Sequence, residues 1–444
     1  MSSRVGLRRW LAMPWLLVLF CLSLAAQPAS YQKISPRQAA ELFRSVDEIT
    51  AFVSHETGLP IHSKVKRALV SREAMLENLR RNMSDDPDTQ RLRHESETLI
   101  KLGLLPRGYS LEKGLLALLG EGVNGYYDEK TQTMNLLDWL PPAAQKPVMA
   151  HELTHALQDQ NFDLRHWTLG EEWKRKDLNF ADRIALEEAI NARQAVLEGQ
   201  GNLVMVDYML APTGQSVQDN PQVLALVRKR MYTGGAETPV FQAAPVVLRE
   251  GMIFPYTSGM DFVMRVQQQR GVEASYGGLL RNPPAETLQI MAPQLYLHGQ
   301  RAPGLRPADF EGLLGPQWER YDDGAVGALD LRVLLLQWGG DAALTSNWRG
   351  GYYAAFRRKN DAKAPLSVAM ALRFATPEAA QSFDVVYRAY LKQRCEALKP
   401  DGEGYASAEG LLQSEVYGPL WMTTESFDAA TAALLHSAML AAAR

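Results

Sequence analysis

The chain is organised around one segment, Val148-Met149-Ala150-His151-Glu152-Leu153-Thr154-His155-Ala156-Leu157. Pro147 stands just before this segment and suits the first turn of a helix, and the apolar residues recur at helical spacing. Residues four positions apart lie one above the other on a helix, so His151 and His155 can offer two imidazoles to one ion. The segment therefore predicts a buried helix that carries two metal ligands.

Glu152 completes the pattern H-E-x-x-H. It directly follows the first histidine, which brings its carboxylate close enough to a metal to take a proton from a bound water without being a ligand. The alternative interpretation is a helix with two solvated or core histidines. The positions that flank the motif are all uncharged, which favours the buried active-site helix of a metal-dependent hydrolase.

Two imidazoles leave a zinc ion short of a catalytic ligand set, which normally has three protein ligands and a water. The predicted third ligand is Glu198, on a long helical pattern that opens near residue 182. Gly199 and Gly201 beside it have no side chains, so this stretch can approach the motif helix closely. A lone acid among apolar and small residues also needs a partner when it is buried. Glu187 and Glu188, earlier on the same helical pattern, are the alternatives, but they lack the glycines.

The N-terminus resembles a secretory signal. Arg4, Arg8 and Arg9 precede an apolar stretch over residues 10–26, and small residues stand where a signal peptidase would cut. We therefore expect a signal peptide over residues 1–25 and a secreted or periplasmic mature chain. An uncleaved membrane anchor is the less favoured alternative, because Pro14 interrupts a stretch that is short for a span.

Composition narrows the classes of partner. The 444 residues are 46% hydrophobic and 22% charged, which is typical of a globular chain with two or three packed units. The net charge of −3 argues against nucleic acid as the main partner, because no basic excess can neutralise phosphates. We expect no transmembrane segment in the mature chain, and no feature of the sequence specifies an oligomeric state.

We predict an α+β fold that is mostly helical. A zincin-like catalytic domain, a small sheet plus the motif helix, is expected over residues 26–212, and a small α+β region over 318–444. Between them we expect a mainly helical region over 213–317, in which helical segments resume from Met260 to Arg270. Residues 125–137 read as two short strands around a turn. This hairpin either pairs with an extended peptide by strand addition or is an ordinary structural hairpin.

With these residues in hand, the chain resembles the gluzincin group of zinc metallopeptidases, and more closely a set of predicted secreted bacterial metallopeptidases. The resemblance rests on Gly125-Tyr126-Tyr127-Asp128, on the motif and its extension to Gln158-Asp159-Gln160, and on Leu197-Glu198-Gly199. It continues more weakly through Phe254-Pro255-Tyr256, Pro283-Pro284 and Trp338-Gly339-Gly340-Asp341. The chain departs from similar sequences at Gln200-Gly201, where they carry an acid and then Ala, and at Met291-Ala292-Pro293, where they carry His-Pro.

The resemblance implies one zinc ion bound by His151, His155 and Glu198, with Glu152 as the general base and a peptide or protein as the substrate. A second oxyanion donor is expected in such a site, and Tyr256, Tyr127 and His298 are the candidates. The competing hypotheses are a binding or scaffold protein of the cell envelope without catalysis, and a zinc hydrolase of a non-peptide amide. We interpret His94 and His166 as surface or packing residues.

Overall fold

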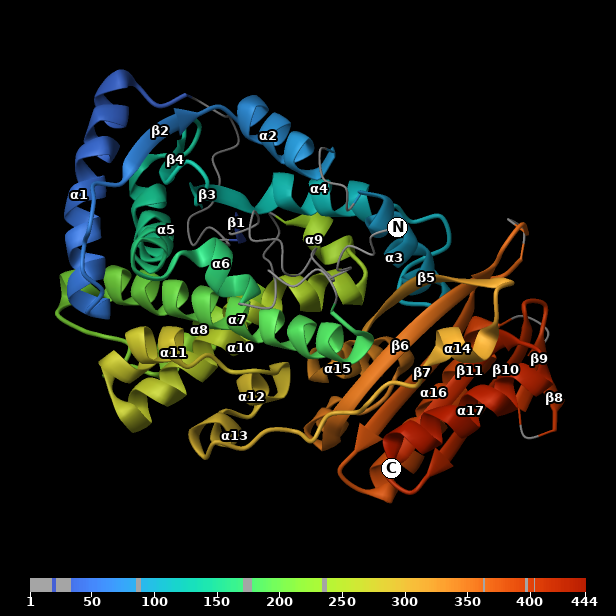
Figure 1. Ribbon diagram of the computed structural model, residues 1–444. Helices are drawn as coiled ribbons and strands as arrows, with labels where there is room; N and C mark the ends of the chain where they lie inside the picture. The colour runs from blue at the N-terminus through green and yellow to red at the C-terminus, as the bar shows by residue number, and fades with distance from the viewer. Residues whose placement is uncertain are drawn as a thin grey trace.

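The computed structural model describes residues 18–20, 33–84, 89–170, 178–233, 238–361, 364–395, 398–402 and 404–444. The fold is α+β and mostly helical, as predicted (Figure 1). Apart from the short strand β1 (Val18–Phe20), the predicted signal peptide lies outside the described residues. Among the residues that are described, no helix has both the length and the apolar character that a membrane span requires.

The first part of the chain forms a small sheet with helices around it. The strands β2 (Lys66–Val70), β3 (Val123–Asp128) and β4 (Thr133–Leu137) join β1 in the order β1-β3-β4-β2. β3 and β4 form an antiparallel hairpin, and β2 runs parallel to β4. The helices are α1 (Pro36–Thr57), α2 (Arg72–Ser84), α3 (Thr89–Lys101), α4 (Leu111–Gly122), α5 (Pro142–Phe162), α6 (Leu164–Leu169) and α7 (Phe180–Leu210).

The motif helix α5 begins earlier than predicted. Its first turn contains Pro142, and Pro147 lies inside the helix. The side chain of Gln145 bonds to the amide and carbonyl of Leu137 and to the carbonyl of Leu140, which ties the additional turn to the end of β4. Proline is costly inside a helix because it removes one backbone hydrogen bond, and these tertiary contacts offset that cost.

The middle of the chain is helical, with η2 (Ala211–Thr213), α8 (Gln222–Thr233), α9 (Pro239–Ala243), α10 (Val246–Arg270), the π-helix η3 (Ala274–Gly278), α11 (Leu279–Arg281), α12 (Thr287–Met291), α13 (Pro293–Leu297) and α14 (Phe310–Leu314). α10 packs along α7. It was expected to begin near Met260, but it begins at Val246 and continues through Pro255.

Two glycines permit the contact between α7 and α10. A Cβ at Gly199 would lie 2.3 Å from the backbone of Gly259, and a Cβ at Gly259 would lie 2.0 Å from the carbonyl oxygen of Ala195. Both distances are far below van der Waals contact, so neither position accepts a side chain without movement of a helix. The backbones of the two helices therefore touch beside Glu198.

The last part of the chain forms a seven-stranded antiparallel sheet in the order β5-β6-β7-β11-β10-β9-β8. Its elements are β5 (Trp318–Ala325), α15 (Ala328–Trp338), η4 (Ala342–Asn347), β6 (Trp348–Arg358), β7 (Ser367–Phe374), α16 (Pro377–Arg394), β8 (Lys399–Asp401), β9 (Gly404–Ser407), β10 (Gly410–Tyr417), β11 (Leu420–Phe427) and α17 (Ala429–Ala443).

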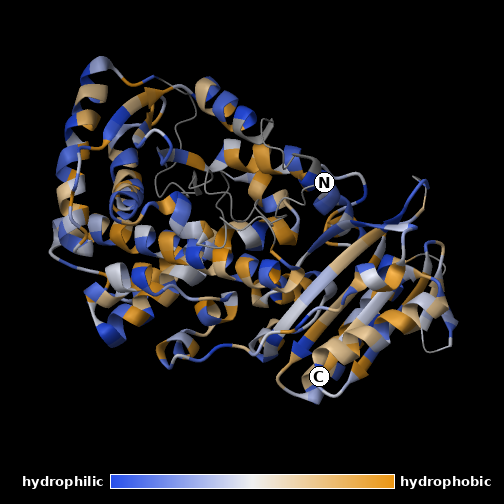
Figure 2. Cartoon of the chain, viewed as in Figure 1, coloured by the Kyte–Doolittle hydropathy of each residue, from blue (hydrophilic) through white to orange (hydrophobic). Residues whose placement is uncertain are grey.

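Helices cover both faces of this sheet. Neighbouring strand residues point to opposite faces, and on β11 Trp421 packs in the core cluster that contains Phe383 of α16, whereas Met422 packs in the cluster that contains Leu435 of α17. Figure 2 shows that α17 is hydrophobic along most of its length. At about 45 Å, α7 is long enough to reach from α5 to this sheet (Figure 1).

Candidate metal centre

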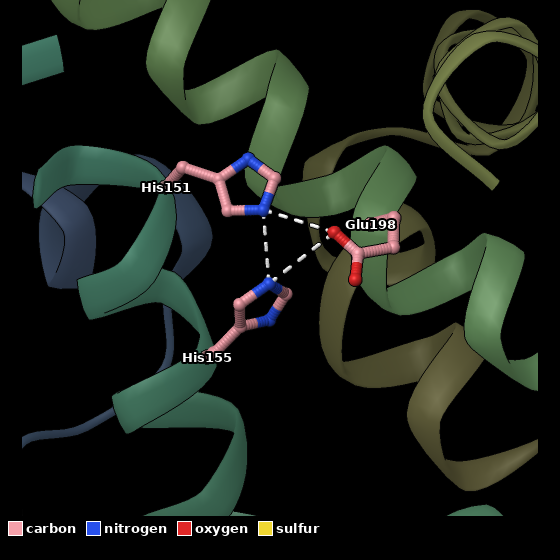
Figure 3. A group of neighbouring side chains, drawn as sticks. All are labelled: His151, His155 and Glu198. Carbon is pink, nitrogen blue, oxygen red and sulfur yellow. Dashed lines mark hydrogen bonds and ion pairs between the residues drawn. The ribbon is translucent and has the colours of Figure 1, made fainter. Parts of the chain in front are cut away.

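The three predicted ligands meet between two helices. Nε2 of His151 lies 2.9 Å from Nε2 of His155 and 3.0 Å from Oε2 of Glu198, and the distance from His155 Nε2 to the same oxygen is 3.5 Å (Figure 3). The histidines, on α5, are fully buried, and Glu198, on α7, is 1% exposed. In the described part of the chain, these residues form a buried group that could hold a metal ion, which confirms the prediction that they come together.

The glycine after Gln200 makes room for the first ligand. A Cβ at Gly201 would lie 2.8 Å from the ring of His151. Together with the Gly199 contact to α10, this explains why the Glu198 segment is rich in glycine although glycine is unfavourable inside a helix. The prediction that glycine lets this stretch approach the motif helix holds for Gly201, whereas Gly199 makes room for α10 instead.

Asn202 orients His151. Its amide nitrogen donates to the carbonyl oxygen of Tyr256 (3.0 Å), and its oxygen faces Nδ1 of His151 (3.1 Å). A carbonyl can only accept, so the asparagine turns its N–H to Tyr256 and its oxygen to the ring. Nδ1 of His151 therefore carries a proton, and Nε2 faces the group with its lone pair.

His155 has its own neutral partner. Its Nδ1 lies 2.7 Å from Oε1 of Gln158, which is one turn further along α5. The sequence reasoning missed both Asn202 and Gln158. The available signal was their position, one turn after a predicted ligand on the same helix, where a side chain can reach a neighbouring imidazole.

Glu152 lies beside the ligand group with one carboxylate oxygen held and one without a partner. The backbone N–H of Tyr127, on β3, donates to Oε2 of Glu152 (2.7 Å), whereas Oε1 is buried and has no hydrogen-bond partner. Burial raises the pKa of Glu152 to about 8. The carboxyl group is therefore oriented by the sheet and leaves one oxygen for an exchangeable proton.

The ligand group combines one carboxylate with two imidazoles. Burial opposes the ionisation of Glu198, but hydrogen bonds with the two histidines outweigh it and lower the pKa of Glu198 to about 2. Burial also disfavours a charged His155, but the bond and the charge of Glu198 outweigh burial and raise the pKa of His155 to about 9. A metal ion would take the place of that proton, because ligands bind metals in deprotonated form.

An unsatisfied atom also fits a cation. Oε1 of Glu198 is buried without a hydrogen-bond partner. A buried carboxylate oxygen that lacks a donor is costly, and metal coordination is one way to compensate it. The donor set, two imidazoles and a carboxylate, is one that divalent transition ions accept.

The alternative third ligands lie elsewhere. Glu187 accepts a hydrogen bond from the amide of Ala325, and Glu188 accepts from the amide and hydroxyl of Thr287. Neither belongs to the group that could hold a metal. Of the three acids considered on this helix, only Glu198 meets the histidines.

The candidate oxyanion donors are placed very differently. The ring of Tyr256 is buried, and its centroid lies 6.2 Å from that of His151. The hydroxyl of Tyr127 donates to Asp159 (2.8 Å), and His298 is exposed. Tyr256 is therefore the candidate that stays next to the ligands, while the hydroxyl of Tyr127 is already engaged.

The two histidines that we interpreted as surface or packing residues, His94 and His166, bond to groups outside the candidate metal centre. His166 is exposed on α6 and pairs with Asp163. His94 is half-buried, stacks on the ring of Tyr321 with centroids 3.9 Å apart, and bonds to its carbonyl. Both therefore have packing or surface roles and lie outside the ligand group.

The predicted hairpin lies next to the motif helix. β3 pairs with β4 on one side and with β1 on the other, where Val18 faces Tyr126. The second edge of β3 is thus occupied by a segment of the same chain.

Comparison of the chain with family models, curated proteins and solved structures found no match.

Proposed function

We propose that this chain is a zinc-dependent peptidase with a zincin-like catalytic part, similar to the gluzincins. The observation that carries the proposal is the convergence of His151, His155 and Glu198 beside a buried Glu152 that has one oxygen without a partner. Two histidines and one glutamate form a recurring catalytic zinc ligand set that leaves a fourth position for water.

Zinc bound by these three residues would supply Lewis acidity, which makes a water acidic and polarises the substrate carbonyl. Glu152 accepts the proton of the attacking water on Oε1, while the amide of Tyr127 holds Oε2 in place. A nearby divalent charge favours the carboxylate form, which offsets the effect of burial on the Glu152 pKa. Glu152 then passes the proton to the leaving amine as the peptide bond breaks.

The test compares two buried glutamates. Glu152→Gln should retain one zinc ion per chain and lose about 10²- to 10⁴-fold in casein hydrolysis, because a general base contributes on this scale. Glu188→Gln is the matched control: this residue is also buried but bonds to Thr287 rather than to the ligand group, so activity should persist. Zinc content is measured by elemental analysis. Casein hydrolysis is measured without chelator, with chelator, and again after zinc is restored.

Equal turnover of Glu152→Gln and the unmodified chain would refute the general-base role. A chain that binds zinc but hydrolyses no peptide would instead favour the scaffold hypothesis or a non-peptide amide as the substrate.

A further inference from the structure

A chain of buried amides runs from the second histidine to a distant π-helix. Nδ1 of His155 meets Oε1 of Gln158, and Nε2 of Gln158 lies 2.7 Å from Oε1 of Gln200. Nε2 of Gln200 then lies 2.7 Å from the carbonyl oxygen of Ser275 and 3.2 Å from that of Tyr276. Both glutamines are fully buried, so no water competes for these groups.

The carbonyl groups at the far end of this amide chain determine which group donates and which accepts at every step. The two main-chain carbonyls can only accept, so Gln200 must turn its NH₂ group to η3 and its oxygen to Gln158. Gln158 must then donate with its own NH₂ group, which also faces the carbonyl of Leu197 at 3.5 Å, and its oxygen points to His155. Nδ1 of His155 is left as the only possible donor.

The amide chain also determines which nitrogen of His155 faces the candidate ligand group. A proton held on Nδ1 leaves Nε2 of His155 with a lone pair whenever the ring is neutral. This nitrogen lies 2.9 Å from Nε2 of His151, whose lone pair Asn202 directs to the same place. Two lone pairs at that separation repel each other unless a proton or a metal ion lies between them. The amide chain therefore prepares the pair of histidines for a cation.

We propose that Gln200 is a positioning residue for the metal centre: it fixes the tautomer of His155 through Gln158, although its own hydrogen bonds go to Gln158 and η3 and not to a candidate ligand. The proposal rests on the metal binding in the proposed function, but not on peptide hydrolysis. The proposal also gives η3 a role in positioning, because its carbonyls of Ser275 and Tyr276 accept the last hydrogen bonds of the amide chain. π-helical turns often occur at functional sites.

The test is a double-mutant cycle on zinc affinity, measured by competition with a chromophoric chelator. Gln200→Met keeps the size of the side chain but removes its polar ends, and it should weaken zinc binding about 10- to 100-fold, as the loss of an outer-shell partner typically does. Gln158→Met should weaken binding at least as much. The double variant should match Gln158→Met alone, because Gln200 acts only through Gln158.

Gln289→Met is the matched control. Gln289 is also a buried glutamine with main-chain partners, but it bonds to Gln300 and Ala285 instead of the ligand group. It should leave zinc affinity unchanged. Additive losses in the double variant, or unchanged affinity in Gln200→Met, would overturn the proposal. The melting temperature of each metal-free variant reports whether it folds.

A second measurement needs no variant at position 200. Long-range ¹⁵N–¹H spectra of the zinc-loaded chain should show His155 protonated at Nδ1, and an Nε2–H tautomer would overturn the inference. A chain that binds zinc without hydrolysing peptides would refute the proposed function alone, since affinities and spectra would still decide the role of Gln200. A chain that binds no zinc would refute both.

Discussion

The two halves of α7 carry the same residue type in two different roles. Glu187 and Glu188 lie in the half near the C-terminal sheet, and Glu198 lies in the half beside α5. All three are less than 5% exposed. The first two accept hydrogen bonds from the amides of Ala325 and Thr287, on elements far along the chain, whereas Glu198 contacts the imidazole nitrogens of His151 and His155.

The difference shows that the partner, and not burial, separates a structural acid from a candidate metal ligand. A main-chain N–H is a permanent donor, so it holds one oxygen of each structural carboxylate and joins α7 to β5 and α12. An imidazole Nε2 can exchange its proton for a metal ion. The four predictions that follow test this contrast, from the largest expected effect to the smallest.

Glu198→Gln should weaken metal binding more than any other substitution in this series. A zinc site with four ligands contributes roughly 10–16 kcal/mol, so an even share is on the order of 3 kcal/mol, or about a hundredfold in affinity, for each ligand. Zinc affinity is measured by chelator competition, with Glu188→Gln as the control at the other end of the helix. Equal zinc affinities of the two variants would contradict the contrast.

Glu187→Ala should destabilise the fold and leave the metal bound. The substitution removes the acceptor of the buried Ala325 amide and an anion 4.0 Å from Arg91. An unsatisfied buried group costs about 1–3 kcal/mol, so the free energy of unfolding should fall by that amount. Denaturation in urea measures it, and one zinc ion per folded chain should remain. Loss of zinc from a variant that still folds would argue against a purely structural role.

Gly201→Ala should weaken zinc binding while the chain still folds. The new methyl group would lie 2.8 Å from the ring of His151, so the ring or the helix must shift. Displacement of one ligand should reduce zinc affinity about tenfold, the lower end of the range for lost positioning contacts. Gly120→Ala is the control on α4, away from the candidate site, where a Cβ would meet only the side-chain end of Leu76 at 3.0 Å. If both alanine variants bind zinc like the parent chain, the fit around His151 is looser than we infer.

Glu188→Gln should change stability in a way that depends on pH. Burial, and then the charge of Asp330, raise the pKa of Glu188 to about 8 from an ordinary value of 4.5. The stability that comes from protonated Glu188 is therefore complete below pH 4.5 and is lost as the pH rises towards 8. Glutamine remains neutral, so the variant should gain on the order of 1 kcal/mol over the parent at pH ~5.5 but much less at pH ~4.

This last difference is measured by urea denaturation of both proteins with a chelator present, so that zinc release at low pH does not contribute. The neighbouring acids Glu286 and Asp330 are present in both proteins, so the comparison isolates Glu188. An equal difference in stability at the two pH values would show that Glu188 is ionised in the folded chain.

Much of the candidate site was predictable because its signals are local. The spacing of His151 and His155 places both on one helix face whatever surrounds it. The glycines around Glu198 indicate that another helix lies close to this segment. The start of α5 and the course of α10 were not predicted correctly, because Pro147 and Pro255 are locally unfavourable in helices. Side-chain bonds of Gln145 and packing against α7 compensate them, and both depend on distant residues.

Sequence alone determined which residues can bind a metal: two imidazoles one helical turn apart and an acid within a glycine-rich stretch. Only the tertiary structure showed that Glu187 and Glu188 bond to other elements, and only it decided which way each histidine faces. The orientation of the histidines rests on carbonyls of α10 and η3, far along the chain from the motif, which orient Asn202 and Gln200. A helical pattern specifies the direction of a side chain from its own axis, but a hydrogen-bond partner on another element is specified only when the chain has folded.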